Sequence, residues 1–199
     1  NYGYRSGLNR SMVRHLEAKV DLLQAIVPLS WDDVVLDIGS NDGTLLKAYQ
    51  EPGVEKVGID PTGEKFRQFY DPSICLVSNF FSQAAFERVA SKRAKIITSV
   101  AMFYDLEDPV GFTQQVAEVL DDEGIWHLEQ SYMPSMLRMN AYDTVCHEHL
   151  EYYSLTALQR IIEKADLRVL DVQMNTVNGG SFAVTVVKKE ARLQSSDAM

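Results

Sequence analysis

Apolar and polar residues follow two different periods along this chain, and the two periods alternate. Short apolar runs bounded by glycine or polar residues predict buried strands, whereas apolar residues repeated every three or four positions predict amphipathic helices. The apolar runs predict strands at residues 33–38, 55–60, 74–77, 95–100 and 124–130. The helical spacing predicts helices between them, at residues 44–51, 62–70, 82–91 and 109–120. Strands that alternate with helices in this way predict a parallel sheet.

Both ends of the chain depart from that alternation. Apolar positions between Leu8 and Val27 keep helical spacing until Pro28, which predicts one amphipathic helix before the first strand. After residue 154 the pattern predicts a helix at 155–165, a strand at 167–174 and a strand at 181–188. The turn Asn178-Gly179-Gly180 between the last two strands predicts an antiparallel hairpin. The expected fold is therefore α/β, a doubly wound Rossmann-like sheet of seven strands that ends in a hairpin.

The expected organisation is one core with short additions. We expect an N-terminal amphipathic helix and lid segment at residues 1–30, a core at 31–190, and a tail or the start of a further segment at 191–199. The length favours a single domain. The first residue is Asn rather than Met, so we expect flanking segments to be missing.

The first predicted strand leads into a glycine turn. Residues 34–43 read Val-Val-Leu-Asp-Ile-Gly-Ser-Asn-Asp-Gly, and a helical pattern starts at Thr44. Gly39 and Gly43 permit backbone angles and close approaches that a β-carbon blocks. Asp60 ends the next predicted strand 21 positions after Gly39, near the spacing at which a carboxylate binds ribose hydroxyls in nucleoside-binding folds. The pattern indicates a cofactor that contains adenosine, although any parallel sheet needs a turn at this place.

Acidic residues in the turn indicate which cofactor it is. Dinucleotide-binding turns have G-x-G-x-x-G, and nucleotide triphosphatases have a lysine after the last glycine, whereas this turn is G-x-x-x-G with Asp37 and Asp42. Carboxylates repel phosphate but suit the sulfonium and ammonium groups of S-adenosylmethionine. We therefore expect S-adenosylmethionine, with S-adenosylhomocysteine as product, and the seven-stranded architecture is that of class I methyltransferases. A dehydrogenase is disfavoured because the phosphate-binding glycines are missing.

The composition of the chain limits which classes of partner it can bind. A net charge of −9 disfavours nucleic acid, and no apolar stretch approaches the roughly 20 residues that span a bilayer. Cys75 and Cys146 are the only cysteines, so neither a disulfide framework nor a four-cysteine zinc module can form from this chain. We expect a cytoplasmic protein that acts on a small molecule.

Titratable and aromatic residues are concentrated between the fifth predicted strand and the late helix. This segment contains His147-Glu148-His149, followed by Tyr152 and Tyr153. Three interpretations are open. His147 and His149 can chelate a metal if the segment is extended, although no further ligands lie at metal-binding spacing, so we expect no metal. A histidine can instead act as a general base with a carboxylate beside it. The third interpretation is a polar loop whose histidines have ordinary partners.

Six short segments give the chain a family resemblance. The segments that carry it are Tyr2-Gly3-Tyr4-Arg5-Ser6, residues 37–44, Gly58-Ile59-Asp60-Pro61, Asn79-Phe80-Phe81, residues 147–154 and Asn178-Gly179-Gly180-Ser181. Together they resemble the sugar C-methyltransferases over nearly the whole chain. The glycine turn is common to many methyltransferases, whereas the string His-Glu-His-x-x-Tyr-Tyr-Ser with the later Gly-Gly-Ser is more specific. The resemblance implies methylation at carbon of a 4-keto deoxysugar carried on a nucleoside diphosphate.

The resemblance also implies roles for individual residues. His149 is the candidate base with Glu148 as its partner and His147 beside them, and Tyr152 or Tyr153 binds the enolate or the sugar. Asp60 and Pro61 bind the ribose end of the cofactor, Asn79 and Phe80 flank the adenine, and Tyr4 closes over the site. The cofactor set is completed by the turn residues and one serine: Asp37, Gly39, Ser40, Asn41, Asp42, Gly43 and Ser99.

The chain also differs from the family pattern. Family members carry a cysteine-rich zinc-binding module before the core and a further domain after the hairpin, and neither is in this sequence. Cys146 stands where tyrosine is frequent, and Met102-Phe103-Tyr104 stands where many members have a histidine. The sugar, the methylated carbon and the oligomeric state are therefore left open. Two alternatives are O-methylation of another small metabolite and a non-catalytic domain that binds S-adenosylmethionine.

Overall fold

A computed structural model of the chain describes residues 3–142 and 144–194, with the side chain of residue 178 left out. Tyr2, Asp143 and the end of the expected tail lie outside the described residues. The chain divides into two compact units, residues 1–98 and 99–199, and each is described by itself.

Parallel strands form the centre of the first unit. They are β1 (Val34–Ile38), β2 (Glu55–Ile59), β3 (Ile74–Val77) and most of β4 (Ala94–Val100). β1 pairs with β2 and with β4, and β2 pairs with β3, in each case in parallel. All five residues of β1 are buried, which explains its continuous apolar run. Parallel pairing places the ends of β1 and β2 at one edge of the sheet, where the glycine turn begins.

One long helix and three short ones complete the first unit. The helices are α1 (Arg10–Ile26), α2 (Thr44–Lys47), α3 (Gly63–Phe66) and α4 (Gln83–Glu87), with 3-10 turns η1 (Ser6–Leu8) and η2 (Arg67–Phe69). α1 begins where Asn9 accepts a hydrogen bond from the Ser11 backbone N–H at 3.0 Å. Its buried face carries Leu16, Val20 and Leu23, at the spacing of one helix face.

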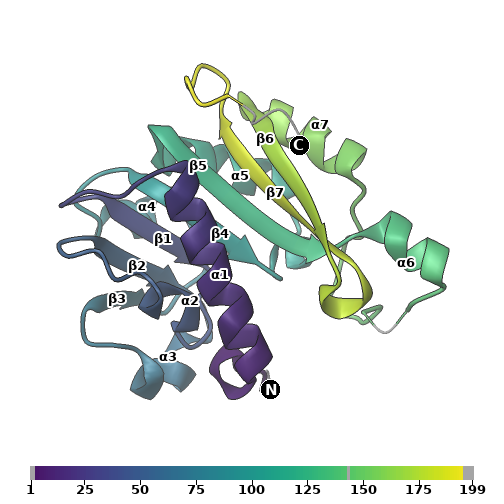
Figure 1. Ribbon diagram of the computed structural model, residues 1–199, viewed down its shortest axis with the longest axis horizontal. Helices are drawn as coiled ribbons and strands as arrows, with labels where there is room; N and C mark the ends of the chain where they lie inside the picture. Colours follow the sequence, from purple (N-terminus) through teal and green to yellow (C-terminus); the bar gives the residue numbers. More distant parts are fainter. Residues whose placement is uncertain (1–2, 143, 195–199) are drawn as a thin grey trace. The chain divides into compact units, whose positions relative to one another are not determined.

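Antiparallel strands dominate the second unit. β5 (Leu120–Ser131) pairs with β7 (Ser181–Lys188), which pairs with β6 (Leu167–Asn175). Figure 1 shows β6 and β7 as a long pair beside β5. The residues between β6 and β7 include a 3-10 turn, η4 (Val177–Gly179). Gly179 has φ +76° and Gly180 has φ +122°, backbone angles at which other residues are strained. The predicted hairpin is confirmed.

The helices of the second unit are α5 (Pro109–Val119), α6 (Met133–Met139) and α7 (Leu155–Glu163), with a 3-10 turn η3 (Phe103–Asp105). Side-chain caps start two of them: Asp108 accepts from the Gly111 N–H at 2.9 Å and Ser154 from the Ala157 N–H at 3.3 Å. α6 was missed from the sequence. Pro134 lies in its first turn, a position that tolerates proline, and the helix extends from the end of β5 (Figure 1).

Three predicted helices are shorter than expected. The pattern at 44–51 gives only α2, which stops before the turn at Pro52 and Gly53. The pattern at 62–70 divides into α3 and η2, and the pattern at 82–91 gives only α4. β5 is longer than predicted because Asp121, Asp122 and Glu123 belong to it.

The strand order confirms the expected fold class. Neighbouring strands are hydrogen-bonded in the order β3-β2-β1-β4-β5-β7-β6. Seven strands with an antiparallel last pair make a Rossmann-like sheet of the methyltransferase kind. Among residues 3–142 and 144–194, no helix has both the length and the apolar content to cross a membrane.

Candidate active site

The glycine turn after β1 has the left-handed backbone that its sequence predicts. Gly39, Asn41 and Gly43 have φ angles of +77°, +52° and +71°. The Gly39 N–H donates to the Ile59 carbonyl at 2.8 Å, which ties the turn to the end of β2. A β-carbon on Gly43 would lie 3.0 Å from the ring of Tyr70. Glycine at position 43 therefore satisfies both the backbone angle and the close ring contact.

Asp60 connects this turn to the residues after β2. Its carboxylate is buried and accepts hydrogen bonds from the Asn41 N–H at 2.7 Å, the Thr62 N–H at 2.6 Å and the Thr62 hydroxyl at 2.6 Å. A carboxylate has about four acceptor positions, so one remains for a ribose hydroxyl. Asp60 therefore fits the ribose of an adenosine cofactor and also holds the turn in place.

Asp37, near the end of β1, is a buried acid with few partners. The Thr98 hydroxyl donates to its Oδ1 at 2.6 Å. Burial raises the pKa of Asp37 to about 7, the Thr98 hydrogen bond opposes this shift, and the charge of Asp60 adds to it. A carboxyl that is costly to ionise is stabilised by a nearby cation. The turn therefore suits a cationic ligand better than a phosphate.

A short N-terminal segment, residues 4–7, is bound to the same turn. Asn41 accepts from the Ser6 N–H at 2.9 Å and donates to the Tyr4 carbonyl at 3.1 Å. Asp42 accepts from the Gly7 N–H at 3.0 Å and lies 3.4 Å from the Arg5 Nε. Both turn side chains therefore bind protein backbone, so Asn41 and Asp42 position Tyr4, which is 48% exposed.

The other expected cofactor residues of the first unit lie in three places. Pro61 follows β2, Asn79 and Phe80 follow β3, and Ser40 is part of the glycine turn. Pro61 and Asn79 are exposed, and Phe80 is 76% exposed. The Asn79 side chain accepts from the Phe80 N–H at 2.8 Å. Ser40 is buried and its hydroxyl lies 2.8 Å from that of Tyr70, which also donates to the Asn41 carbonyl at 3.0 Å. An exposed aromatic ring directly after β3 is available to stack on a planar ligand.

Ser99 lies in the second unit and is completely buried. Its hydroxyl accepts a hydrogen bond from the Trp126 indole N–H at 3.1 Å. This bond satisfies an indole donor in the core, so the side chain has a structural partner within its own unit.

His149 is the best-positioned titratable group of the second unit. Its Nδ1 lies 2.6 Å from the Thr144 carbonyl oxygen. A carbonyl only accepts, so Nδ1 carries the proton, and Nε2 of the neutral ring is left as a base. The imidazole also packs on the Tyr104 ring, with centroids 4.0 Å apart. The Tyr104 carbonyl accepts from the N–H groups of Leu150 and Glu151 at 2.9 and 3.0 Å, which ties η3 to the histidine segment.

Glu148 and His147 lie at the surface of this segment. The His147 side chain is 91% exposed, and its Nε2 lies 4.0 Å from Glu148 Oε1. Glu148 was expected to be the partner of His149, but the Nδ1 partner is a backbone carbonyl instead. Asp105 is the other acid of this cluster. Burial and the charge of Glu148 raise its pKa to about 6, while the charge of His149 opposes the shift.

The two adjacent tyrosines have different environments. Tyr153 is buried and its ring lies 5.4 Å from that of Phe103. Burial and the charge of Glu151 raise the pKa of Tyr153 to about 12, and its hydroxyl has no hydrogen-bond partner among the described residues. Tyr152 lines a cavity. Tyr152 therefore presents its ring to a cavity, and Tyr153 has a hydroxyl that is available to donate a hydrogen bond.

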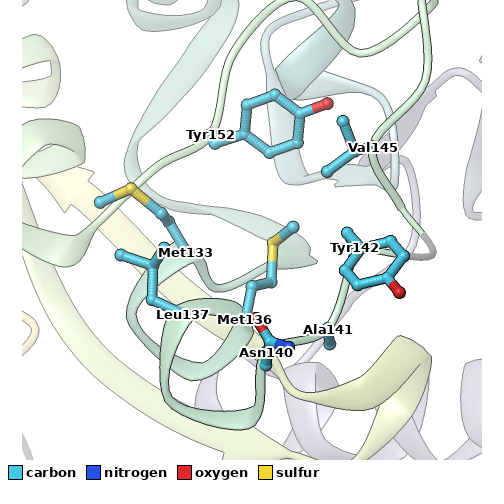
Figure 2. Close-up of a pocket in the computed structure, with 8 residues that line it drawn as sticks. All are labelled: Met133, Met136, Leu137, Asn140, Ala141, Tyr142, Val145 and Tyr152. Atoms are coloured by element: carbon cyan, nitrogen blue, oxygen red, sulfur yellow. The ribbon is translucent and has the colours of Figure 1, made fainter.

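A cavity of about 350 Å³ lies beside α6. Figure 2 shows Met136 between Met133 and Tyr142, with Tyr152 on the opposite side. Leu137, Asn140, Ala141 and Val145 complete the lining. Thr144 connects this cavity to His149, because its hydroxyl lies 3.6 Å from the Met136 sulfur and its carbonyl accepts from the imidazole.

Sequence reasoning missed several residues of these sites. Tyr70 and Thr62 hold the glycine turn and Asp60, and Thr144 orients His149. The spacing Asp60-x-Thr62 is a local signal, since an aspartate often accepts from a residue two positions on. No sequence signal marks Thr144, because its contribution comes from a backbone carbonyl.

Comparison with known proteins gives one curated relative and several similar structures. The chain is 29% identical over 186 residues to the C-methyltransferase NovU of Streptomyces niveus; the match covers 92% of this chain and 44% of NovU. The chain thus spans less than half the length of that relative.

Two solved methyltransferases illustrate the shared fold. The plantazolicin methyltransferase BpumL matches with a TM-score of 0.68 at 14% identity, covering 93% of this chain and 88% of BpumL. The magnesium protoporphyrin IX methyltransferase of Synechocystis PCC 6803 matches with a TM-score of 0.64 at 12% identity, covering 94% and 90%. Both were crystallised with S-adenosylhomocysteine. At these identities the matches show a common fold.

A family match gives the enzyme class. Residues 10–172, most of the chain, match the model of a family described as a methyltransferase domain. The class and cofactor expected from the sequence, a methyltransferase that uses S-adenosylmethionine, are confirmed. The chain belongs to this family of methyltransferase domains.

Proposed function

We propose that this methyltransferase adds a methyl group to a carbon next to the ketone of a 4-keto deoxysugar carried on a nucleoside diphosphate. The observation that carries the proposal is the His149 geometry. Its Nδ1 is fixed on the Thr144 carbonyl, which leaves Nε2 free to remove a proton. The relative NovU, whose name is that of a C-methyltransferase, supports carbon as the acceptor.

Methylation at carbon needs this kind of base. A carbon next to a ketone becomes nucleophilic only when its proton is removed and the enolate oxygen is stabilised. His149 removes the proton, and its contact with Tyr104 restricts the ring. Tyr153, whose hydroxyl has no hydrogen-bond partner among the described residues, donates a hydrogen bond to the enolate oxygen, and Tyr152 positions the substrate. Glu148 is exposed, so it contributes charge near the base or binds the substrate. His147 is 91% exposed and lies beside Glu148 without taking part in proton removal.

The first unit holds the cofactor. S-adenosylmethionine supplies an electrophilic methyl group on a sulfonium. Asp60 binds the ribose through its remaining acceptor position with Pro61 beside it, while Phe80 and Asn79 flank the adenine. The glycine turn and Asp37 hold the cationic methionine end, and Tyr4 covers it. For Ser99 we propose an indirect contribution, since its hydroxyl is bonded to Trp126.

We also propose the division into a helix and lid segment (1–30), a methyltransferase core (31–190) and a tail (191–199). The family match to residues 10–172 includes most of the proposed core.

Product analysis tests the reaction. The chain is incubated with S-adenosylmethionine and a panel of nucleotide-linked 4-keto deoxysugars, and the products are examined by mass spectrometry and NMR. A new methyl resonance on carbon supports the proposal. A methyl group on oxygen would instead make the chain an O-methyltransferase, and cofactor binding without turnover on any acceptor would point to a non-catalytic binding domain.

Replacing Asp60 tests the cofactor assignment. We expect Asp60→Ala to weaken S-adenosylhomocysteine binding roughly tenfold or more, because a hydrogen bond to a charged group contributes about 1.5–3 kcal/mol. Isothermal titration calorimetry measures the affinity.

Asp71 offers a matched control. It accepts from the Ser73 N–H at 2.9 Å and from the Ser73 hydroxyl at 2.6 Å, the same local pattern that Asp60 has with Thr62, but it is exposed. Asp71→Ala should leave the affinity within roughly twofold. Equal affinities for both variants and the parent chain would rule out Asp60 as the ribose ligand.

A further inference from the structure

The cavity beside α6 has a neutral lining. None of its eight described lining residues carries a formal charge. Its walls are thioether and aliphatic groups from α6 and from Ala141 and Val145 after it, with the two aromatic rings of Tyr142 and Tyr152 (Figure 2). At about 350 Å³ the cavity lies at the low end of the range for ligand pockets, so it suits one compact group rather than a whole large ligand.

We propose that this cavity binds the nucleobase of the nucleotide that carries the acceptor sugar. The inference rests on the proposed function, since it assigns one part of that substrate to a place. The substrate has three chemically different parts: a diphosphate, a keto-sugar and a base. Each part needs different protein groups, and the lining of the cavity distinguishes between them.

The diphosphate does not suit this lining, because phosphate oxygens need cations or several N–H donors. A keto-sugar suits it less well than a base does, because each sugar hydroxyl needs a hydrogen-bond partner, and the polar groups of the described lining are the Asn140 amide and two tyrosine hydroxyls. A base has apolar faces and polar edges. Aromatic rings stack on such faces, and thioethers pack well against aromatic edges. Tyr142 and Tyr152 supply the rings, and Met133 and Met136 supply the sulfur atoms.

Asn140 provides the polar contact that a base needs. It is the single amide side chain among the described lining residues, and a carboxamide both donates and accepts, as the amide-like edge of a base does. Its backbone lies in the left-handed region, with φ +51°, and its N–H caps the end of α6. The residue is therefore held at a fixed place on the rim of the cavity.

The cavity is also connected to the base catalyst. Thr144, between the lining residues Tyr142 and Val145, holds His149 through its carbonyl and contacts Met136 through its hydroxyl. A base bound against Met136 and Val145 therefore restricts the segment that orients the imidazole. Recognition of the nucleotide and positioning of His149 share this one segment.

Nucleosides without phosphate test the inference, because charge then plays no part. Saturation-transfer NMR measures binding of thymidine, uridine, cytidine, adenosine and guanosine to the chain, with saturating S-adenosylhomocysteine present to occupy the cofactor's own adenosine site. We expect at least one nucleoside to bind. Val145→Trp fills the cavity and should weaken that binding roughly tenfold or more.

Met139→Trp is the matched control, since Met139 is exposed at the end of the same helix and does not line the cavity. It should leave nucleoside binding within roughly twofold. Affinity for S-adenosylhomocysteine should be unchanged in both variants, which shows that both are folded. Equal weakening by both tryptophans would overturn the inference, as would the failure of all five nucleosides to bind.

Turnover separates this inference from the proposed function. If nucleosides bind with the expected variant pattern but no keto-sugar is methylated, the base site stands and the proposed reaction fails. If a nucleotide-linked keto-sugar is methylated and Val145→Trp leaves its KM unchanged, the reaction stands and the base site is wrong.

Discussion

Replacing His149 with glutamine should lower methyl transfer roughly 100-fold or more while leaving cofactor affinity unchanged. Glutamine retains an N–H group that can donate to the Thr144 carbonyl, so the segment keeps its anchor. It has no group that takes a proton near neutral pH, and removing a general base typically costs a factor of about 10² to 10⁴ in rate. A fall in turnover with unchanged S-adenosylhomocysteine binding would therefore report the loss of proton removal.

Proton removal can also be measured without methyl transfer. With S-adenosylhomocysteine bound, the parent chain should still exchange the proton next to the ketone with D₂O, which NMR follows as loss of that resonance. His149→Gln should not catalyse this exchange. The partial reaction distinguishes a base from a residue that only shapes the site, since a structural defect would also lower the affinity for S-adenosylhomocysteine.

His147→Gln is the control, because it changes the same side chain two positions away. Its imidazole is exposed, and we expect turnover and exchange within roughly threefold of the parent chain. Exchange retained by His149→Gln, or lost equally in His147→Gln, would remove His149 from the role of base.

The fold was predictable where one sequence period persisted over a whole element. β1 is buried throughout, and its apolar run identified it without ambiguity. The hairpin of β6 and β7 was predicted from two runs and the glycines between them. α6 was missed because it has only seven residues, with Pro134 in its first turn. The stability of a short helix depends mainly on the residues that it packs against, and the spacing of apolar residues within the helix says little about those partners.

The candidate site was predictable to the level of side-chain chemistry but not of contacts. The spacing of Gly39, Gly43 and Asp60 predicted a cofactor turn, and the density of titratable groups predicted His149 as the base; both stay predictions. The partner of His149 was expected to be Glu148, yet a carbonyl oxygen of Thr144 holds it. Every residue has a carbonyl, so sequence cannot indicate which one lies within hydrogen-bonding distance. Likewise, the sequence did not indicate that the side chains of Asn41 and Asp42, which we expect to bind the cofactor, also accept hydrogen bonds from residues 6 and 7.

Replacing Asp37 with asparagine should stabilise the protein, and the gain should grow with pH. Burial raises the pKa of Asp37 from 3.8 to about 7, so the folded state binds this proton more tightly than the unfolded chain does. Between these two values, stability falls by about 1.4 kcal/mol for each pH unit as pH rises. Ionisation of Asp37 therefore lowers the free energy of unfolding by about 4 kcal/mol above pH 7 and has no effect on it below pH 3.8. Asparagine keeps an oxygen that accepts from Thr98 but does not ionise.

Urea unfolding at pH 5 and pH 8 measures this difference. The stability gained by Asp37→Asn should be about 3 kcal/mol larger at pH 8 than at pH 5. Asp71→Asn is the control of opposite sign, since hydrogen bonds from Ser73 lower the pKa of Asp71, and it should give no gain at either pH. Parallel profiles for Asp37→Asn and the parent chain would show that Asp37 ionises freely. The same variant should bind S-adenosylmethionine more weakly than the parent chain does, because asparagine removes the negative charge that a cationic ligand favours.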